Sequence, residues 1–426
     1  MTTPMTHVRT SVGSSDRVSI QPVISALWVV LALAIPIYRI LPGTVANLWT
    51  YGALGLVMAV LLLGRGGKPK WPGVWMFAGL CALVAGVVSS GASGLAKTLP
   101  IGIQLFILLG LTPFALRGSV LRDARLLTKA SMSFTVAQSV SALVGVVQLL
   151  GVPVLGYAAV YGRSPGLAGH PNVLGVMGAI AVLLCTHMLA ARVPFPHFLL
   201  IGALTVNAAG VLTTGSLSSM FACAFGVLFI LSSHRIPIRK VVGILAVGAL
   251  ALWAVLQSPV VAQYFRSPAD RFFQVTGQTD DISTLDIRLK TYHVAWERIQ
   301  IDPFMGKGID PGQSAAFGNT MVHNLFLHAW YQGGIALAAG IGAVLLAALI
   351  LVVQALRTRQ FALPVAVLIT VLSYALTSAF FEQVYYWLPV IAAWASLPTT
   401  PITNPEKPPA LRTSPRRTGR APHGAR

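Results

Sequence analysis

The stretch NVLGVMGAIAVLLCTHMLA at residues 172–190 decides the fold class of this chain. It contains no aspartate, glutamate, lysine or arginine. At a rise of about 1.5 Å per residue, a helix of this length spans a hydrocarbon core about 30 Å thick. The stretch is therefore typical of a transmembrane helix.

Apolar runs of this kind recur from one end of the chain to the other. Hydrophobic residues make up 55% of the sequence and charged residues only 10%, whereas charged residues approach about a quarter of a soluble domain. We therefore predict an all-α, polytopic membrane protein with about twelve transmembrane helices. The predicted spans are 23–41, 46–63, 73–89, 99–116, 131–152, 172–190, 196–213, 214–233, 240–257, 333–356, 362–381 and 383–397.

Charge placement predicts how the spans are oriented. The net charge is +19, but the basic residues sit in short clusters between apolar runs, so a nucleic-acid-binding face is excluded. With the N-terminus inside, the inner segments hold 21 of the 30 lysines and arginines, as the positive-inside rule requires. We expect both termini to be cytoplasmic, and we interpret the first span as a retained anchor in the cytoplasmic (inner) membrane.

Composition also divides the chain into segments. A polar leader at 1–22 precedes transmembrane helices 1–9, which are expected within 23–257, and helices 10–12 are expected within 333–397. Between them, residues 258–332 hold seven of the eleven acidic residues, so we predict a large extracytoplasmic loop there. The basic, proline-rich tail at 398–426 is predicted to be disordered.

Few chemical groups are available inside the membrane. The predicted spans carry no aspartate or glutamate, and Glu382 stands only at an outer boundary. This absence counts against an ion-coupled transporter and against a glycosidase with paired carboxylates. Cys81, Cys185 and Cys223 are scattered singly, so no metal site and no disulfide framework are predicted.

The segment that opens the sixth span is rich in glycine and proline. It reads RSPGLAGHPN from Arg163 to Asn172 and includes His170. Asn172 is expected to cap the following helix. Arg163 would suit a phosphate or diphosphate, because the planar guanidinium binds such oxygens bidentately. The alternative is a boundary arginine that contacts lipid head groups.

An amphipathic helix is predicted between Ser283 and Pro303. Its apolar positions recur at steps of three and four, and Lys290 lies on the opposite, polar side. Arg288 falls at the edge of the apolar stripe, where a charge is costly unless it is paired. A structural ion pair or a snorkelling arginine is the alternative to a ligand-binding role. The stripe is formed by Leu285, Leu289, Tyr292, Trp296 and Ile299.

A third group stands where the loop re-enters the membrane. Gly306 and Gly308 allow a tight backbone path, although a bare GxG is a weak phosphate-loop signal. His323 and Asn324 follow, before a pair of glycines at 333–334. If Asn319 or Thr320 caps the next helix, His323 lies in its first turn. There the helix dipole keeps the imidazole neutral, as a general base requires. The alternative is a structural histidine.

Together these three groups resemble the O-antigen ligase and O-antigen polymerase superfamily, the lipid-linked glycan transferases with a large extracytoplasmic loop. One feature departs from the family pattern, because Gly215-Ser216-Leu217 stands where the family often has a Ser-Arg pair. The residues that carry the resemblance are Arg163, Gly166, Pro171, Asn172, Arg288, Trp296, Pro303, Gly306, Gly308, His323, Asn324, Gly333 and Gly334.

The resemblance implies a GT-C-like membrane enzyme that performs an inverting, metal-independent glycosyl transfer with no cofactor. The donor would be a glycan on a polyprenyl (undecaprenyl-type) diphosphate at the outer face, used in cell-envelope polysaccharide biosynthesis. Arg163 and Arg288 would bind the diphosphate, and His323 would take the proton of the acceptor hydroxyl. Further substrate-binding residues would be His170, Asn172, Lys290, Gly306, Gly308, Asn324 and Glu382.

Three alternatives remain open at the level of sequence. A ligase passes the glycan to a lipid, protein or wall acceptor, whereas a polymerase passes it to another lipid-linked repeat, and nothing in the sequence defines the acceptor. An exporter of a polar solute would need polar residues at mid-membrane depth and a pseudo-symmetric repeat. In a non-catalytic scaffold, the three polar groups would be coincidental.

Overall fold

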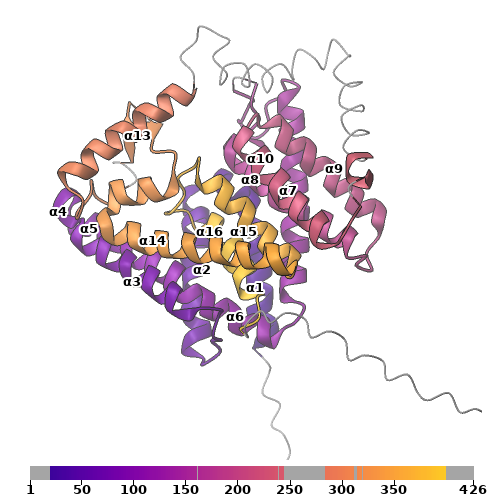
Figure 1. The fold of residues 1–426 in the computed structure, drawn as a ribbon, viewed down its shortest axis with the longest axis horizontal. Coiled ribbons are helices and arrows are strands. Elements are labelled where there is room, and N and C mark those ends of the chain that lie inside the picture. The colour runs from indigo at the N-terminus through magenta and orange to yellow at the C-terminus, as the bar shows by residue number, and fades with distance from the viewer. Residues whose placement is uncertain are drawn as a thin grey trace, which may run out of the picture.

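The computed structural model describes residues 20–160, 162–237, 239–243, 284–310, 314–318 and 320–399. The fold is mostly helical, at 76%. Within the described ranges, seven helical segments are long and apolar enough to cross a membrane, and four apolar helices are shorter. The chain is therefore a multi-pass helical protein (Figure 1).

The first half of the chain forms helices joined by short turns. A π-helical segment, η2, continues α5 into α6. The elements are α1 (Gln21–Ala34), η1 (Ile35–Ile40), α2 (Gly43–Leu62), α3 (Pro72–Val88), α4 (Ser90–Ser93), α5 (Leu95–Leu105), η2 (Phe106–Leu111), α6 (Thr112–Arg122), α7 (Leu126–Leu149), η3 (Gly166–Ala168), α8 (Pro171–Ala190), α9 (His197–Thr213) and α10 (Leu217–Ser233).

The second half begins with the helix that was predicted to be amphipathic. A short antiparallel hairpin follows it, and three apolar helices complete the fold. The elements are α13 (Thr284–Ile301), β1 (Ala315–Phe317), β2 (Thr320–Met321), α14 (Leu325–Thr358), α15 (Ala362–Ala375) and α16 (Val384–Ala395).

The predicted count of twelve transmembrane helices is not confirmed. Each of the long and short apolar helices coincides with a predicted run, but the run 240–257 lies outside the described residues after position 243. The same holds for most of the predicted leader and tail and for the first part of the predicted loop at 258–332. The extent of that loop therefore stays a prediction.

Helix α8 forms the centre of one half of the molecule. It packs against α7, α9, α10 and α15, and its residues from Val173 to Cys185 are buried. Small residues permit this close packing. A Cβ at Gly178 would lie 2.9 Å from a methyl group of Val211 on α9. In the other half, α14 runs along α3 (Figure 1).

Helix α14 begins earlier than the boundary at 332/333 that was predicted for the membrane re-entry. It starts at Leu325 and bends at Gly334, whose φ is 64° and ψ is −167°. The bend needs a glycine, because a Cβ at Gly334 would collide with the backbone carbonyl of Phe304. The segment around Phe304, which precedes α14 in the sequence, is therefore packed directly against the bend.

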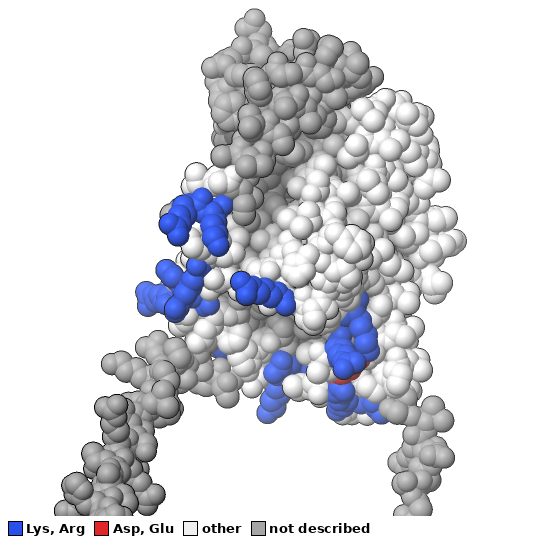
Figure 2. All heavy atoms as spheres, turned by 90° about the vertical axis from the view of Figure 1, so that its right-hand side faces the viewer, with Lys and Arg blue, Asp and Glu red and all other residues white. Residues whose placement is uncertain are grey.

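Basic side chains gather at one end of the bundle, which we call the basic end and define by Arg65, Arg117, Arg122 and Lys129. Arg122 donates to the carbonyl of Arg65, and Lys129 lies 3.2 Å from Asp123. Arg65 also donates to Gln21 at 3.0 Å, so α1 starts at this end. Figure 2 shows lysines and arginines along one side and the lower edge of one face, beside a broad white surface.

Candidate functional site

Arg163 is held by two hydrogen bonds before α8 begins. Its Nε donates to the carbonyl of Thr214 at 2.8 Å, and its Nη2 donates to Oδ1 of Asn172 at 2.6 Å. A backbone bridge to Val160 fixes the main chain at the same residue. The guanidinium therefore has a defined place at the end of the bundle where α8 starts.

His170, and not Asn172, caps α8. The prediction that Asn172 caps the helix is wrong, because Pro171 starts the helix and the ring of His170 accepts from the Asn172 amide at 3.2 Å. Nδ1 is the accepting atom, so a neutral ring carries its proton on Nε2. Burial lowers the pKa of His170 to about 4, and the charges of Arg39, Arg163 and His323 act in the same direction.

Helix α13 packs only part of the predicted stripe against the protein, namely Ile299 and the half-buried Tyr292. Thr291, Ala295 and Ile299 are buried, whereas Leu289 and Trp296 are exposed by 54% and 47%. The prediction failed for Leu289 and Trp296 because α13 carries apolar side chains on its exposed side as well as on its packed side. The buried face is one that Arg288 can share, since it precedes Thr291 by three residues and Ala295 by seven.

Arg288 therefore lies on the packed side of α13, as its position at the edge of the stripe suggested. Its Nε is buried and has no hydrogen-bond partner among the described residues. A buried donor without a partner is unfavourable, and for a charged group the penalty is larger. The guanidinium of Arg288 is thus suited to an anionic ligand.

His323 lies before α14 rather than in its first turn. The N-cap is Asn324, whose Oδ1 accepts from the amide of Leu327 at 2.9 Å. Thr320, one of the two predicted caps, belongs to β2, and Asn319 lies outside the described residues. The helix dipole is therefore not the main influence on the ring. Burial lowers the pKa of His323 to about 4, and the charge of Arg288 acts next.

Three segments that are distant in the sequence meet at this end of the bundle. The charge of Arg288 acts on His323, and the charges of Arg163 and His323 act on His170. Tyr374 on α15 joins the group through a hydrogen bond of 3.4 Å to the carbonyl of Asn172. We call Arg163, His170, Arg288 and His323 the arginine–histidine site.

The glycines predicted to bind substrate have packing roles in the structure. A Cβ at Gly306 would lie 2.7 Å from the carbonyl of Gln332, and one at Gly308 would collide with Ser93. Lys290 is exposed, and its Nζ lies 5.8 Å from the centre of the Phe317 ring. These contacts are with other parts of the protein, and a binding role for these three residues stays a prediction.

Glu382 lies among different neighbours from those of the four site residues. Its Oε1 is buried without a hydrogen-bond partner among the described residues, and its backbone carbonyl accepts from Gln104 at 3.3 Å. Burial raises the pKa of Glu382 to about 7, and the negative charge of Asp310 acts in the same direction. Asp310 lies 3.5 Å from Lys97. Glu382 therefore belongs to a neighbouring acidic group.

Arg39 is a residue that the sequence analysis did not select. It stands in η1, and its charge acts on His170. The sequence feature that could have indicated Arg39 is a lone basic residue in a short outer connection with no acidic residue beside it. Among the described residues, no group of three or more His, Cys, Asp or Glu could hold a metal ion.

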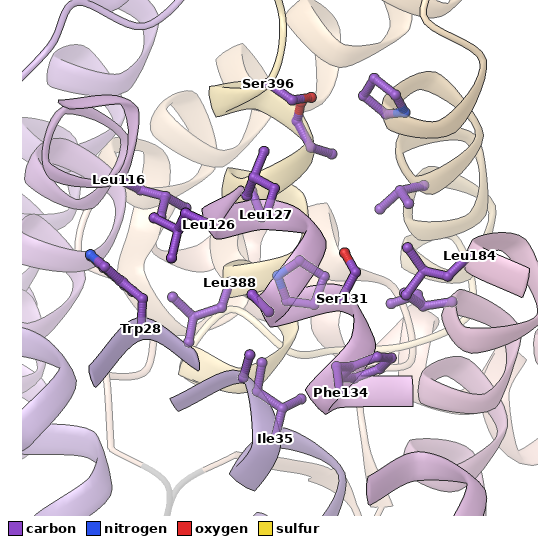
Figure 3. Close-up of a pocket in the computed structure, with 18 of the residues that line it drawn as sticks. Trp28, Ile35, Leu116, Leu126, Leu127, Ser131, Phe134, Leu184, Leu388 and Ser396 are labelled. Carbon is purple, nitrogen blue, oxygen red and sulfur yellow. The ribbon is translucent and has the colours of Figure 1, made fainter. Parts of the chain in front are cut away.

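An apolar cavity of about 160 Å³ lies elsewhere in the bundle (Figure 3). Trp28, Ile35, Phe134, Leu184 and Leu388 are among its lining residues. None of the four residues of the arginine–histidine site lines it. Its lining includes the hydroxyls of Ser131 and Ser396 but no charged residue, so the cavity adds no charged group to the candidate chemistry.

One segment of the chain matches a known protein family. Residues 199–341 match the family model described as O-antigen ligase. About a third of the chain is therefore similar to the O-antigen ligase family. This confirms the resemblance seen in the sequence, and it implies a glycosyltransferase-like enzyme whose partners are lipid-linked glycans and their acceptors. A comparison with curated proteins finds no match.

The segment that matches the O-antigen ligase model includes only part of the site. Arg288, His323 and Asn324 lie inside the matched residues, whereas Arg163 and His170 come before them. The fold brings the two groups together through α8, α14 and α15. The site of this O-antigen ligase-like chain is thus assembled across the boundary of the matched segment.

Proposed function

We propose that the protein transfers a glycan from a polyprenyl diphosphate to an acceptor hydroxyl, as a ligase does. The observation that carries this proposal is the placement of two arginines and two histidines from three separate segments. Arg163 donates to the side chain of Asn172, whose backbone amide donates to His170. One turn after Arg288, Tyr292 donates to the backbone carbonyl of His323. The family match supports the handling of lipid-linked glycans. An anionic ligand would supply a partner for the buried Nε of Arg288.

The arginines would bind the diphosphate of the donor. Arg288 has a buried Nε without a partner, and a phosphate oxygen would provide one. Arg163 is fixed by its hydrogen bonds to Asn172 and Thr214, and its positive charge would act on the same diphosphate. Negative charge grows on the diphosphate as it leaves, and groups that stabilise such charge typically contribute about 2.7–4 kcal/mol each.

His323 would act as the general base. With a pKa of about 4, its ring is neutral at pH 7 and can accept a proton. Binding of a diphosphate beside Arg288 would offset the positive charge that disfavours the imidazolium. The basicity of His323 would therefore rise when the donor is bound, at the stage when a base is required.

The reaction then balances without a metal ion or other cofactor. The acceptor oxygen forms a bond to the anomeric carbon, and the bond from that carbon to the diphosphate oxygen breaks. The electron pair leaves with the diphosphate, and the proton of the acceptor passes to Nε2 or Nδ1 of His323. Attack from the face opposite the leaving group inverts the anomeric centre.

The proposal includes a membrane orientation. The site lies at the end of the bundle away from the basic end, and basic residues favour the cytoplasmic side. We propose that the protein lies in the cytoplasmic membrane with both termini inside and the site facing outward. A lipid-linked donor at the outer leaflet would then reach the arginines from the membrane.

Transfer by purified protein tests the function, and glycan profiling of a deletion strain distinguishes its variants. The ligase predicts that long lipid-linked chains accumulate in the deletion strain. Accumulation of single lipid-linked repeats would instead identify a polymerase. An exporter would move solute into vesicles without forming a glycosidic bond, and that outcome would contradict the proposal.

A further inference from the structure

We propose that Arg39 provides a third cation for the donor, so that the site selects a lipid diphosphate over a lipid monophosphate. This inference rests on the proposed function and extends it to a residue outside the matched family segment. It assigns a ligand-binding role to η1, a short helix at the end of the first predicted span.

The backbone of η1 packs directly against the turn that carries the site. Gly169 has a φ of 66°, and a Cβ at this position would lie 3.1 Å from Cβ of Arg39. The absence of a side chain at Gly169 therefore lets Arg39 approach the residue before His170. The same turn leads from Arg163 into α8, so Arg39 and Arg163 flank one short loop.

Tyr38 fixes the orientation of η1. Its hydroxyl lies 2.9 Å from Oγ1 of Thr50, and its ring centre lies 5.1 Å from that of Tyr385 on α16. Successive residues of a 3₁₀ helix point about a third of a turn apart. Because Tyr38 is directed toward α2 and α16, Arg39 extends in a different direction.

A row of buried tyrosines connects η1 to the site. The ring centres of Tyr385 and Tyr386 lie 4.7 Å apart, and the hydroxyls of Tyr386 and Tyr374 lie 3.3 Å apart. Tyr374 in turn donates to the carbonyl of Asn172. The segment that bears Arg39 is thus tied through a row of tyrosines to the residue that holds Arg163.

Arg39 is available for a ligand. Its side chain is exposed, and it makes no hydrogen bond or ion pair with any other described residue. Its Cβ lies against Gly169, the residue before His170, and burial together with the positive charge of Arg39 lowers the pKa of the His170 ring. A cation without an acidic partner at a non-cytoplasmic boundary also departs from the positive-inside pattern.

Arg39 would be the third arginine of the site. Arg163 is held by the carbonyl of Thr214, and Arg288 has a buried Nε without a partner among the described residues. One phosphate cannot use three guanidinium groups fully, because each binds oxygen pairs. A third arginine is therefore useful chiefly for the second phosphate of a diphosphate.

The test compares inhibition of transfer by polyprenyl diphosphate and by polyprenyl monophosphate, using full-length protein. The variants are Arg39→Gln and Arg39→Lys, with Lys97→Gln as a control. Lys97 is exposed and pairs with Asp310, away from the arginine–histidine site. Thermal melting in detergent establishes that each variant is folded.

We expect Arg39→Gln to weaken binding of the diphosphate about tenfold or more and to raise the donor KM with little change in kcat. The monophosphate should be affected much less, and Arg39→Lys should restore part of the preference. An unchanged preference in Arg39→Gln would overturn the inference while the proposed function stands. A wild-type protein that is inhibited equally by both lipids would also overturn the inference alone, whereas a wild-type protein that transfers no glycan from the diphosphate donor would overturn both.

Discussion

The hydroxyl of Tyr292 on α13 donates a hydrogen bond of 2.8 Å to the backbone carbonyl of His323. Arg288 stands one turn before Tyr292 on the same helix. This bond therefore holds the candidate base beside the arginine whose charge acts on it. The loop that contains His323 and the amphipathic helix form one unit of the site.

Removal of the Arg288 charge should change the pH dependence of transfer. The pKa of His323 is lowered to about 4 by burial and then by Arg288, so the pKa should rise toward its ordinary value in Arg288→Gln. A base works only when deprotonated, so kcat/KM falls as the pH drops through this pKa. The acid limb of the residual activity should therefore move to higher pH.

The matched control for this experiment is Arg298→Gln on the same helix. The Arg298→Gln variant also removes one positive charge, but Arg298 does not contribute to the lowered pKa of His323. Its acid limb should match that of the wild type. Identical acid limbs in Arg288→Gln and Arg298→Gln would contradict the claim that the charge of Arg288 lowers the pKa of the base.

Arg163→Lys should fold but lose at least tenfold in transfer. Lysine keeps the positive charge, yet its single ammonium cannot hold Thr214 and Asn172 and also present a planar pair of donors to phosphate. The measurement is kcat/KM with a defined donor, together with thermal melting. Near-normal transfer would mean that Arg163 serves only to anchor its loop.

Impermeant thiol reagents should label the two ends of the bundle differently in intact cells. His293 has 75% of its side chain exposed, so a cysteine placed there should react from outside. A cysteine in place of Arg125, at the basic end, should react only after the membrane is opened. The reverse pattern would contradict the proposed orientation and the access of the donor.

Glu382→Gln should stabilise the protein at alkaline pH. The pKa of Glu382 is raised to about 7, so the folded state holds a proton that the unfolded chain releases near pH 4.5. Stability therefore falls as the pH rises from about 4.5 to 7 and then stays low. The melting temperature of the variant should exceed that of the wild type by a few degrees at pH 8 and match it near pH 5. Equal melting temperatures at both values would contradict the burial of an unpaired carboxylate.

The apolar helices could be predicted from the sequence because long runs without charged residues are stable as helices inside a lipid bilayer. It also selected Arg163, Arg288 and His323, since alternating spans bring their segments to the same side. Helix starts were less predictable. His170 and Asn172 could each cap α8, and only the packed turn decides which side chain reaches the free amide.

The contribution of the N-terminal region could not be predicted in this way. Arg39 reaches the site because Gly169 leaves space for η1 and Tyr38 orients it. Both effects depend on contacts between segments far apart in the chain. The inward face of α13 was likewise set by packing, which buries Thr291 and leaves Trp296 exposed.

The most direct test of the account is glycan transfer by purified protein from a defined polyprenyl-diphosphate donor. His323→Ala should retain donor binding and lose activity on the order of 10²–10⁴-fold, whereas Glu382→Gln should keep most of it. Wild-type rates in His323→Ala, together with complete loss in Glu382→Gln, would show that Glu382 is the base and would contradict the central claim.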